Sequence, residues 1–180
     1  MRTRTPVTTT PRLLLTRPHR DDSDWVFAIH GDPATNQHNP HGPHASIQDS
    51  TRFLTSTLAD WDRDAIGYCA VTTHQDPTTV IGFAGARLSD LAGDRVLNLY
   101  YRFTPTTWGQ GIAQEAARAA LDLARTRFPT STVVALIRAD NQPSKRLAER
   151  LGLHPTHTRD TAGRDIWRLS PTELAHPGAL

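Results

Sequence analysis

The sequence has 180 residues, of which 37% are hydrophobic and 21% charged, which suffices for one compact domain and is too short for the usual two. The formal net charge is +2, with charges spread along the chain, which gives no strong case for nucleic-acid binding. One cysteine, Cys69, cannot form an internal disulfide, and no apolar run approaches the roughly 20 residues that cross a bilayer. We therefore expect a single cytoplasmic domain over 1–180, preceded by a flexible leader over 1–9, without nucleic-acid or membrane partners.

Strand and helix patterns alternate in the first part of the chain. Apolar spacing, helix-capping residues and Gly- or Pro-rich breaks separate them. The predicted elements are a strand over 12–17, a helix over 24–30, a loop over 31–46, a helix over 47–61, and strands over 65–73, 79–88 and 95–103. The strands over 65–73 and 79–88 flank the turn 74–77 and should pair antiparallel.

The second part of the chain follows a strand–helix–strand order. A helical pattern over 112–128 ends at Pro129, and the continuous apolar run 133–137 is typical of a strand buried on both faces in a parallel arrangement. A further helix begins at 140–143 and stops at Gly152, and it is followed by strands over 154–159 and 165–169. The predicted architecture is α+β, a mixed sheet with helices on its faces.

The stretch 108–113, Trp-Gly-Gln-Gly-Ile-Ala, carries the clearest chemical signal. Two glycines with free backbone amides lead into a helix N-terminus, where the helix dipole favours an anion such as a phosphate. Gln114 stands where a dinucleotide-binding G-x-G-x-x-G motif needs its third glycine. No Lys-Ser or Lys-Thr pair follows, as a Walker loop would require. A phosphate-bearing ligand of another kind is therefore indicated.

With these features the sequence resembles the GNAT acyltransferases, and among them the RimJ/RimL type of N-terminal acetyltransferase. The motifs that carry the resemblance are 10–18 (TPRLLLTRP), 80–85 (VIGFAG), 101–105 with 108–113 (YRFTP, WGQGIA), and 141–144 with 147–153 (NQPS, LAERLGL). The resemblance implies a GNAT fold: a mixed, mostly antiparallel sheet of six to seven strands, splayed between the fourth and fifth strands, with helices on both faces.

The resemblance also implies acetyl-CoA as cosubstrate, no metal, and transfer of the acetyl group to a primary amine of a protein N-terminus or a small molecule. Main-chain groups of residues 101–103 would pair with the pantetheine arm, the amides of 109–114 would bind the pyrophosphate, and the Ser144 hydroxyl would protonate the leaving thiolate. The cofactor-binding residues implied are Tyr101, Arg102, Phe103, Trp108, Gly109, Gln110, Gly111, Ile112, Ala113, Gln114, Asn141 and Ser144.

The general base is not identified by the resemblance. Leu136 and Ala148 occupy positions where some relatives have a catalytic Glu and Tyr, so those two roles do not carry over. By residue type the candidates are His38, His41, His44 and Asp64. The three histidines are spaced three apart, but Pro40, Gly42 and Pro43 break the helix that would align them, so we expect no zinc site.

Two other functions stay open. The missing Glu and Tyr are compatible with a non-catalytic acyl-CoA-binding sensor, and the glycine turn alone is compatible with a nucleotide-binding regulatory module. The chain could act as a monomer or a homodimer. Cys69 lies in an apolar strand pattern, and we expect it in the core rather than as an acyl-carrying nucleophile.

Overall fold

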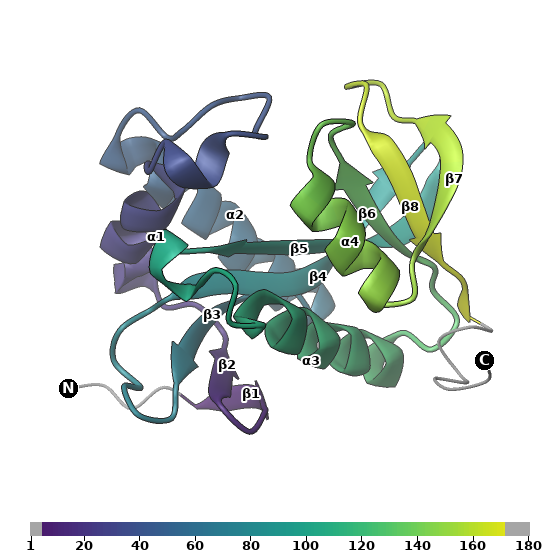
Figure 1. Ribbon diagram of the computed structural model, residues 1–180. Helices are drawn as coiled ribbons and strands as arrows, with labels where there is room; N and C mark the ends of the chain where they lie inside the picture. The colour runs from purple at the N-terminus through teal and green to yellow at the C-terminus, as the bar shows by residue number, and fades with distance from the viewer. Residues whose placement is uncertain (1–4, 172–180) are drawn as a thin grey trace.

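The computed structural model describes residues 5–171, which form one eight-stranded mixed sheet flanked by four α-helices (Figure 1). The strands are β1 (Pro6–Thr9), β2 (Leu13–Thr16), β3 (Tyr68–Thr73), β4 (Gly82–Leu91), β5 (Asp94–Phe103), β6 (Val133–Ile137), β7 (His154–Arg159) and β8 (Asp165–Leu169). The helices are α1 (Ser23–His30), α2 (Ile47–Asp64), α3 (Ile112–Arg127) and α4 (Gln142–Arg150), with short 3₁₀ turns η1 (Arg20–Asp22), η2 (Ala34–Asn36) and η3 (Pro105–Thr107). Among these residues no helix is both long and apolar enough to cross a membrane.

The strand count corrects the prediction of six to seven. The additional strand is β1, because Pro6–Thr9, expected in a flexible leader, pairs antiparallel with β2. The β-branched residues Val7, Thr8 and Thr9 favour an extended backbone. The turn that follows is closed by the Thr10 N–H, which donates to the Leu13 carbonyl at 3.0 Å.

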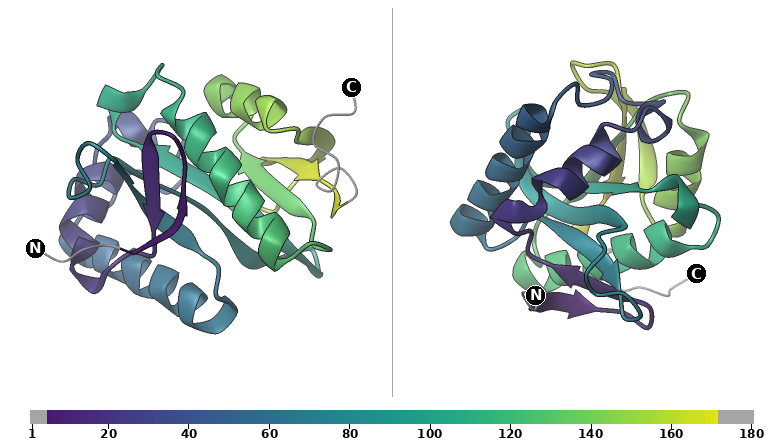
Figure 2. Two further views of the ribbon diagram at one scale, coloured as in Figure 1. Left: turned by 90° about the horizontal axis from the view of Figure 1, so that it is seen from below. Right: turned by 90° about the vertical axis from the view of Figure 1, so that its left-hand side faces the viewer.

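The sheet order is β1-β2-β3-β4-β5-β6-β8-β7, and its two faces carry different helices (Figure 2). Helices α1 and α2 cover one face through a core that includes Val26, Leu54 and Phe83. Helices α3 and α4 cover the other face, where small residues such as Ala120 bring α3 close to the strands. The two faces therefore present different surroundings to alternate side chains of the central strand β5.

Strands β5 and β6 separate after a short pairing, as the sequence predicts for the fourth and fifth strands. They run parallel, and their register contains only Leu97 opposite Val133 and Asn98 opposite Val134. Strand β5 continues to Phe103, paired on its other edge with β4, while β6 turns to pair with β8. The last residues of β5 therefore present an unpaired edge to the opening between the strands.

Candidate functional site

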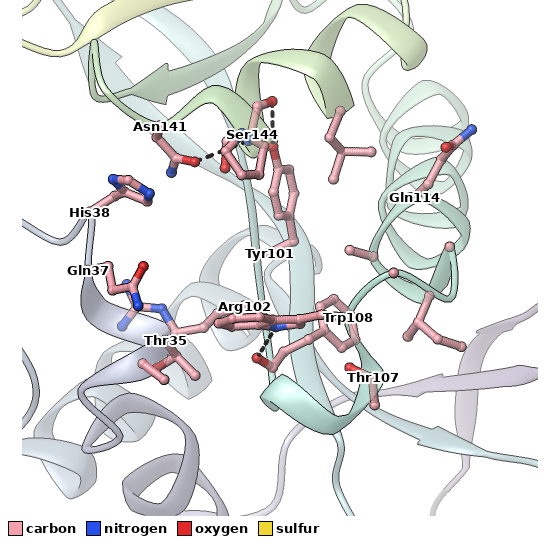
Figure 3. A pocket seen from close by; sticks show the side chains of 18 of the residues that line it. Thr35, Gln37, His38, Tyr101, Arg102, Thr107, Trp108, Gln114, Asn141 and Ser144 are labelled. Carbon is pink, nitrogen blue, oxygen red and sulfur yellow. Dashed lines mark hydrogen bonds between the residues drawn. The ribbon is translucent and has the colours of Figure 1, made fainter.

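A cavity of about 540 Å³ lies at this opening (Figure 3). Its walls are the connection between α1 and α2, the end of β5, the glycine turn with the start of α3, and the first turns of α4. The lining residues are Ala34, Thr35, Gln37, His38, Asn39, Tyr101, Arg102, Phe103, Thr107, Trp108, Gly109, Gly111, Ile112, Ala113, Gln114, Asn141, Pro143, Ser144, Leu147 and Arg150. All the predicted cofactor residues except Gln110 are thus brought together.

Near its end, β5 has one residue, Tyr101, whose main-chain N–H and carbonyl both face the cavity. The Leu97 N–H donates toward β6, to the Thr132 carbonyl at 2.9 Å, so the main-chain groups of alternate residues such as Tyr101 and Phe103 face the same side. The Phe103 carbonyl already accepts the Trp108 indole N–H at 3.0 Å. The main chain of Arg102 faces β4, opposite Phe83. Residues 101–103 were the three expected to expose main-chain groups. Among them, Tyr101 is the residue whose N–H and carbonyl both face the opening without a hydrogen bond to β4 or to Trp108.

The glycine turn adopts a backbone that favours glycine at two positions. Gly109 and Gly111 both have φ of +75°, in the left-handed region, and Gly111 is the N-cap of α3. The N–H groups of the first helical turn have no partners within the helix, and the helix dipole adds partial positive charge there. The Gln110 side chain donates to the Thr106 carbonyl, at 2.8 Å, and does not line the cavity, so any contribution of Gln110 would come from its main-chain N–H, as the resemblance implies.

The glycine turn is braced by residues from the first strand pair. Glu115, in the first turn of α3, accepts hydrogen bonds from the Thr10 hydroxyl at 2.5 Å, the Arg12 main-chain N–H at 3.0 Å and the Arg12 Nε at 2.6 Å. The Arg12 guanidinium also donates to the Gln110 carbonyl at 3.0 Å. Partial burial by itself raises the pKa of Glu115, but these hydrogen bonds outweigh it and hold that pKa below its usual 4.5.

Helix α4 presents Ser144 to the cavity from its first turn. Asn141 is the N-cap of this helix, and its side-chain oxygen accepts the Ser144 N–H at 3.1 Å. The Tyr101 hydroxyl donates to the Ser144 carbonyl at 3.2 Å, which joins β5 to α4 across the opening (Figure 3). Burial raises the pKa of Tyr101 to about 12, so this hydroxyl keeps its proton at neutral pH.

His38 is the base candidate that lines the cavity. Its ring lies beside Asn141, and its Nδ1 is shielded from solvent, 3.5 Å from Asp140 Oδ1 and without a hydrogen bond from the described residues (Figure 3). Asp140 is held in place by the Arg138 guanidinium at 3.0 Å, and this interaction keeps the pKa of the carboxyl below its usual range. A proton on Nδ1 directed at Asp140 would leave Nε2 with its lone pair.

The other base candidates lie outside the cavity. His41 is exposed on the same loop. His44 stacks on buried His30 at 5.0 Å, and its Nδ1 lies 2.9 Å from the Ser50 hydroxyl. Asp64 is paired with Arg63 at 2.6 Å and with Arg95 at 3.3 Å.

Cys69 is buried in the core, as predicted, and burial raises the pKa of its thiol to about 12, which suppresses the thiolate that a nucleophile requires. Within residues 5–171 no three His, Cys, Asp or Glu side chains gather closely enough to hold a metal ion.

Several residues of the cavity and its surroundings are not predicted from the sequence. Thr35 and Gln37 come from a loop without periodicity, and Arg150 lies on a helix face that reads as solvent-exposed. The Arg12–Glu115 brace joins residues 103 apart, a separation that no local pattern reveals. The motif at 10–18 was the one signal that drew attention to Arg12.

Comparison with known proteins agrees with this geometry. Residues 12–154 match the family described as "Acetyltransferase (GNAT) domain". The chain therefore belongs to the GNAT acetyltransferase family, the enzyme class that the sequence predicted. A curated relative, the uncharacterized protein YkkB of Bacillus subtilis, is 36% identical over 78 residues, which are 43% of this chain and 45% of that protein. This match thus spans less than half of the relative's length.

Solved structures share the fold over nearly the whole chain. An acetyltransferase from Agrobacterium tumefaciens superposes with a TM-score of 0.77 at 23% identity, covering 94% of this chain and 96% of that one. Spermidine N-acetyltransferase from Vibrio cholerae, in complex with CoA and spermine, gives 0.73 at 15% identity, covering 93% and 100%. The ribosomal alpha-N-protein acetyltransferase RimL, in complex with coenzyme A, gives 0.70 at 14% identity, covering 91% and 97%. These likenesses establish the GNAT fold and do not single out the RimJ/RimL branch.

The Glu115 brace makes stability depend on pH. Replacement Glu115→Gln should lower the free energy of unfolding at pH 7 by about 1–2 kcal/mol, because it removes charge-assisted hydrogen bonds to a half-exposed arginine. Since the folded pKa lies below 4.5, the stabilisation is complete above pH 4.5 and is lost as the pH falls through the folded value. Urea unfolding of both proteins at pH 7 and pH 3.5 should show the difference shrinking at the lower pH. An equal difference at both values would contradict a charged role for Glu115.

Proposed function

We propose that the protein is an N-acetyltransferase that moves an acetyl group from acetyl-CoA to a primary amine by direct attack on the thioester. The observation that carries this proposal is the open edge of β5. There the unpaired main chain of Tyr101 borders one cavity together with the glycine turn and Ser144. A strand edge can accept an extended amide-bearing ligand as an added strand, and the adjoining turn supplies N–H groups for an anion.

The residues present fit the cosubstrate. The Tyr101 N–H and carbonyl would bind the pantetheine amides, and the N–H groups of residues 109–114 would bind the pyrophosphate, with Arg12 and Glu115 fixing the turn. The Asn141 amide nitrogen remains for the pantetheine arm, since the side-chain oxygen caps α4. Acetyl-CoA, when bound, supplies an activated acetyl thioester. Trp108 is half exposed at the rim and would close over the arm.

His38 and Ser144 would handle the two protons of the reaction. The His38 imidazole, oriented by Asp140, would accept at Nε2 the proton that the attacking amine gives up. The Ser144 hydroxyl would donate a proton to the departing sulfur. Both residues line the same cavity, His38 from the loop after η2 and Ser144 from the first turn of α4.

The branch and the acceptor are narrower proposals. The motifs at 10–18 and 141–144 support assignment to the RimJ/RimL type, with a protein N-terminus or a small-molecule amine as acceptor. The alternative is an acyl-CoA-binding sensor without turnover, which the absent Glu and Tyr of some relatives favour. Thiol release from acetyl-CoA in the presence of an amine panel separates them, because a sensor would bind CoA and release no thiol.

Two substitutions at Gly111 that differ in charge but share the same backbone strain test whether the glycine turn binds the pyrophosphate. Gly111→Ala and Gly111→Asp both place a side chain at φ +75°, with the Arg12 guanidinium 3.6 Å from the added Cβ, but only the second adds a negative charge to the turn. We expect Gly111→Asp to weaken CoA binding at least tenfold more than Gly111→Ala, measured by calorimetry. Circular dichroism should show both variants folded. Equal affinities would exclude this turn as the pyrophosphate site.

Ser144 can be tested by separating turnover from binding. Ser144→Ala should lower kcat by roughly tenfold to a hundredfold while the affinity for CoA changes little, because the lost proton acts on the leaving thiolate. Ser144→Thr keeps the hydroxyl and serves as the control, retaining most of the turnover. A Ser144→Ala enzyme with the rate of the parent protein would remove this role.

His38 has a matched control three residues away. His38→Gln should reduce kcat by roughly a hundredfold or more with CoA affinity retained, since it removes the base that accepts the amine proton. His41→Gln replaces an exposed histidine of the same loop outside the cavity and should leave kcat unchanged. Steady-state rates with saturating acetyl-CoA measure both variants. Similar losses in the two variants would point to an effect on the loop, and an unaffected His38→Gln enzyme would refute the assignment.

A further inference from the structure

Arg102 is a positioned cation on the acceptor side of the cavity. Its side chain leaves β5 next to Tyr101 but on the opposite face, and it extends toward the loop that carries Thr35 and Gln37 (Figure 3). One guanidinium nitrogen donates to Asn36 Oδ1 at 2.5 Å, and the group lies 6.0 Å from the centre of the Tyr100 ring. These contacts hold the guanidinium at the wall formed by the α1–α2 connection.

The contacts of Arg102 leave most of its donors unused. A guanidinium has five N–H groups, and the described hydrogen bonds use one of them. None of its nitrogens is both buried and unpartnered, and Arg102 lines the cavity. Asn36 does not require this donor either, because its Oδ1 also accepts from the Asn39 amide at 2.8 Å.

No carboxylate neutralises Arg102 among residues 5–171. Arg87 also lies over a tyrosine ring, 5.4 Å from the centre of Tyr68. Unlike Arg102, it has a carboxylate partner, Asp60, at 3.5 Å. Arg87 does not line the cavity. A partly buried charge without a counter-ion is costly unless a ligand completes it.

Together with burial, the positive charge of Arg102 lowers the pKa values of two neighbouring histidines, His30 and His44. Burial, followed by the positive charge of Arg102, lowers the pKa of His30 to about 3. The same two causes lower the pKa of His44. His30 is therefore neutral, and its ring nitrogens are engaged by the Val26 carbonyl at 3.1 Å and the Tyr100 hydroxyl at 2.7 Å. Neither histidine adds a competing cation at neutral pH.

We propose that Arg102 binds a carboxylate of the acceptor, so that the amine substrates are amino acids or short peptides rather than polyamines. This inference rests on the proposed acetyl transfer to an amine. A planar guanidinium matches a carboxylate through two parallel hydrogen bonds. No aspartate or glutamate occurs among the described residues that line the cavity, so nothing there would attract the additional ammonium groups of a polyamine.

The test compares each of a set of amino acids and dipeptides with its own carboxamide, and spermidine serves as the polycationic probe. Loss of the carboxylate lowers the basicity of the neighbouring amine, so an enzyme without a carboxylate subsite would acetylate the carboxamide faster. We expect the parent protein to show a kcat/KM at least tenfold higher for the best acid than for its carboxamide. Spermidine should be acetylated more slowly than that acid.

Two arginine variants then assign the preference. Arg102→Met should abolish or reverse the preference for the acid, whereas Arg87→Met removes an arginine from a similar ring contact and should retain it. A preference for the carboxamide or spermidine in the parent protein, or an unchanged preference in Arg102→Met, would overturn the proposal.

A binding measurement separates this inference from the proposed function. Calorimetric titration with the N-acetylated acid and with its carboxamide requires no turnover. The acid should bind at least tenfold more tightly to the parent protein and lose that advantage in Arg102→Met. Acetylation of amines without such discrimination would leave the acetyltransferase standing and remove the carboxylate subsite. Arg102-dependent binding of the acid without any turnover would do the reverse.

Discussion

The separation of β5 from β6 is the constraint on which the site depends. Main-chain N–H and carbonyl groups away from water must be paired, and in a closed sheet Tyr101 would pair with the next strand. Here the strands part after Asn98, and the hydroxyl of Tyr101 reaches α4 instead, at the Ser144 carbonyl. A side-chain hydrogen bond thus links the two walls of the opening, and the main chain of Tyr101 keeps a donor and an acceptor that a ligand can satisfy.

The alternation of side chains along β5 divides the cavity between two kinds of chemistry. Tyr101 points to the α3–α4 face, beside the glycine turn, and Arg102 points to the α1–α2 face, beside the loop with His38. On the first face the turn contributes backbone amides and a helix dipole, which suit a phosphate without a dedicated lysine. On the second face the cavity is lined by side chains of an irregular loop. Strand β5 thus contributes side chains to two different parts of the same cavity.

The features that could be predicted from the sequence are those encoded in short, local patterns of residues. The glycines at 109 and 111, the small residues of α3 and the apolar run of β6 define a turn–helix–strand unit, and the structure contains it nearly as expected. The β1 strand was missed because four residues rich in threonine carry too little hydrophobic pattern. Arg102 was expected to act through its main chain, whereas its side chain meets Asn36, 66 residues away. Such contacts arise from tertiary packing, which periodicity does not report.

The brace between Arg12 and Glu115 has a consequence for folding. It spans 103 residues, so the glycine turn reaches its final shape only when the first strand pair has docked against α3. Contacts this distant in sequence close large loops and form late, since chain entropy opposes them. The conformation of the glycine turn therefore depends on the docking of the first strand pair as well as on its own residues. A proteolytic cut near residue 11 would disable the turn from a site almost a hundred residues away.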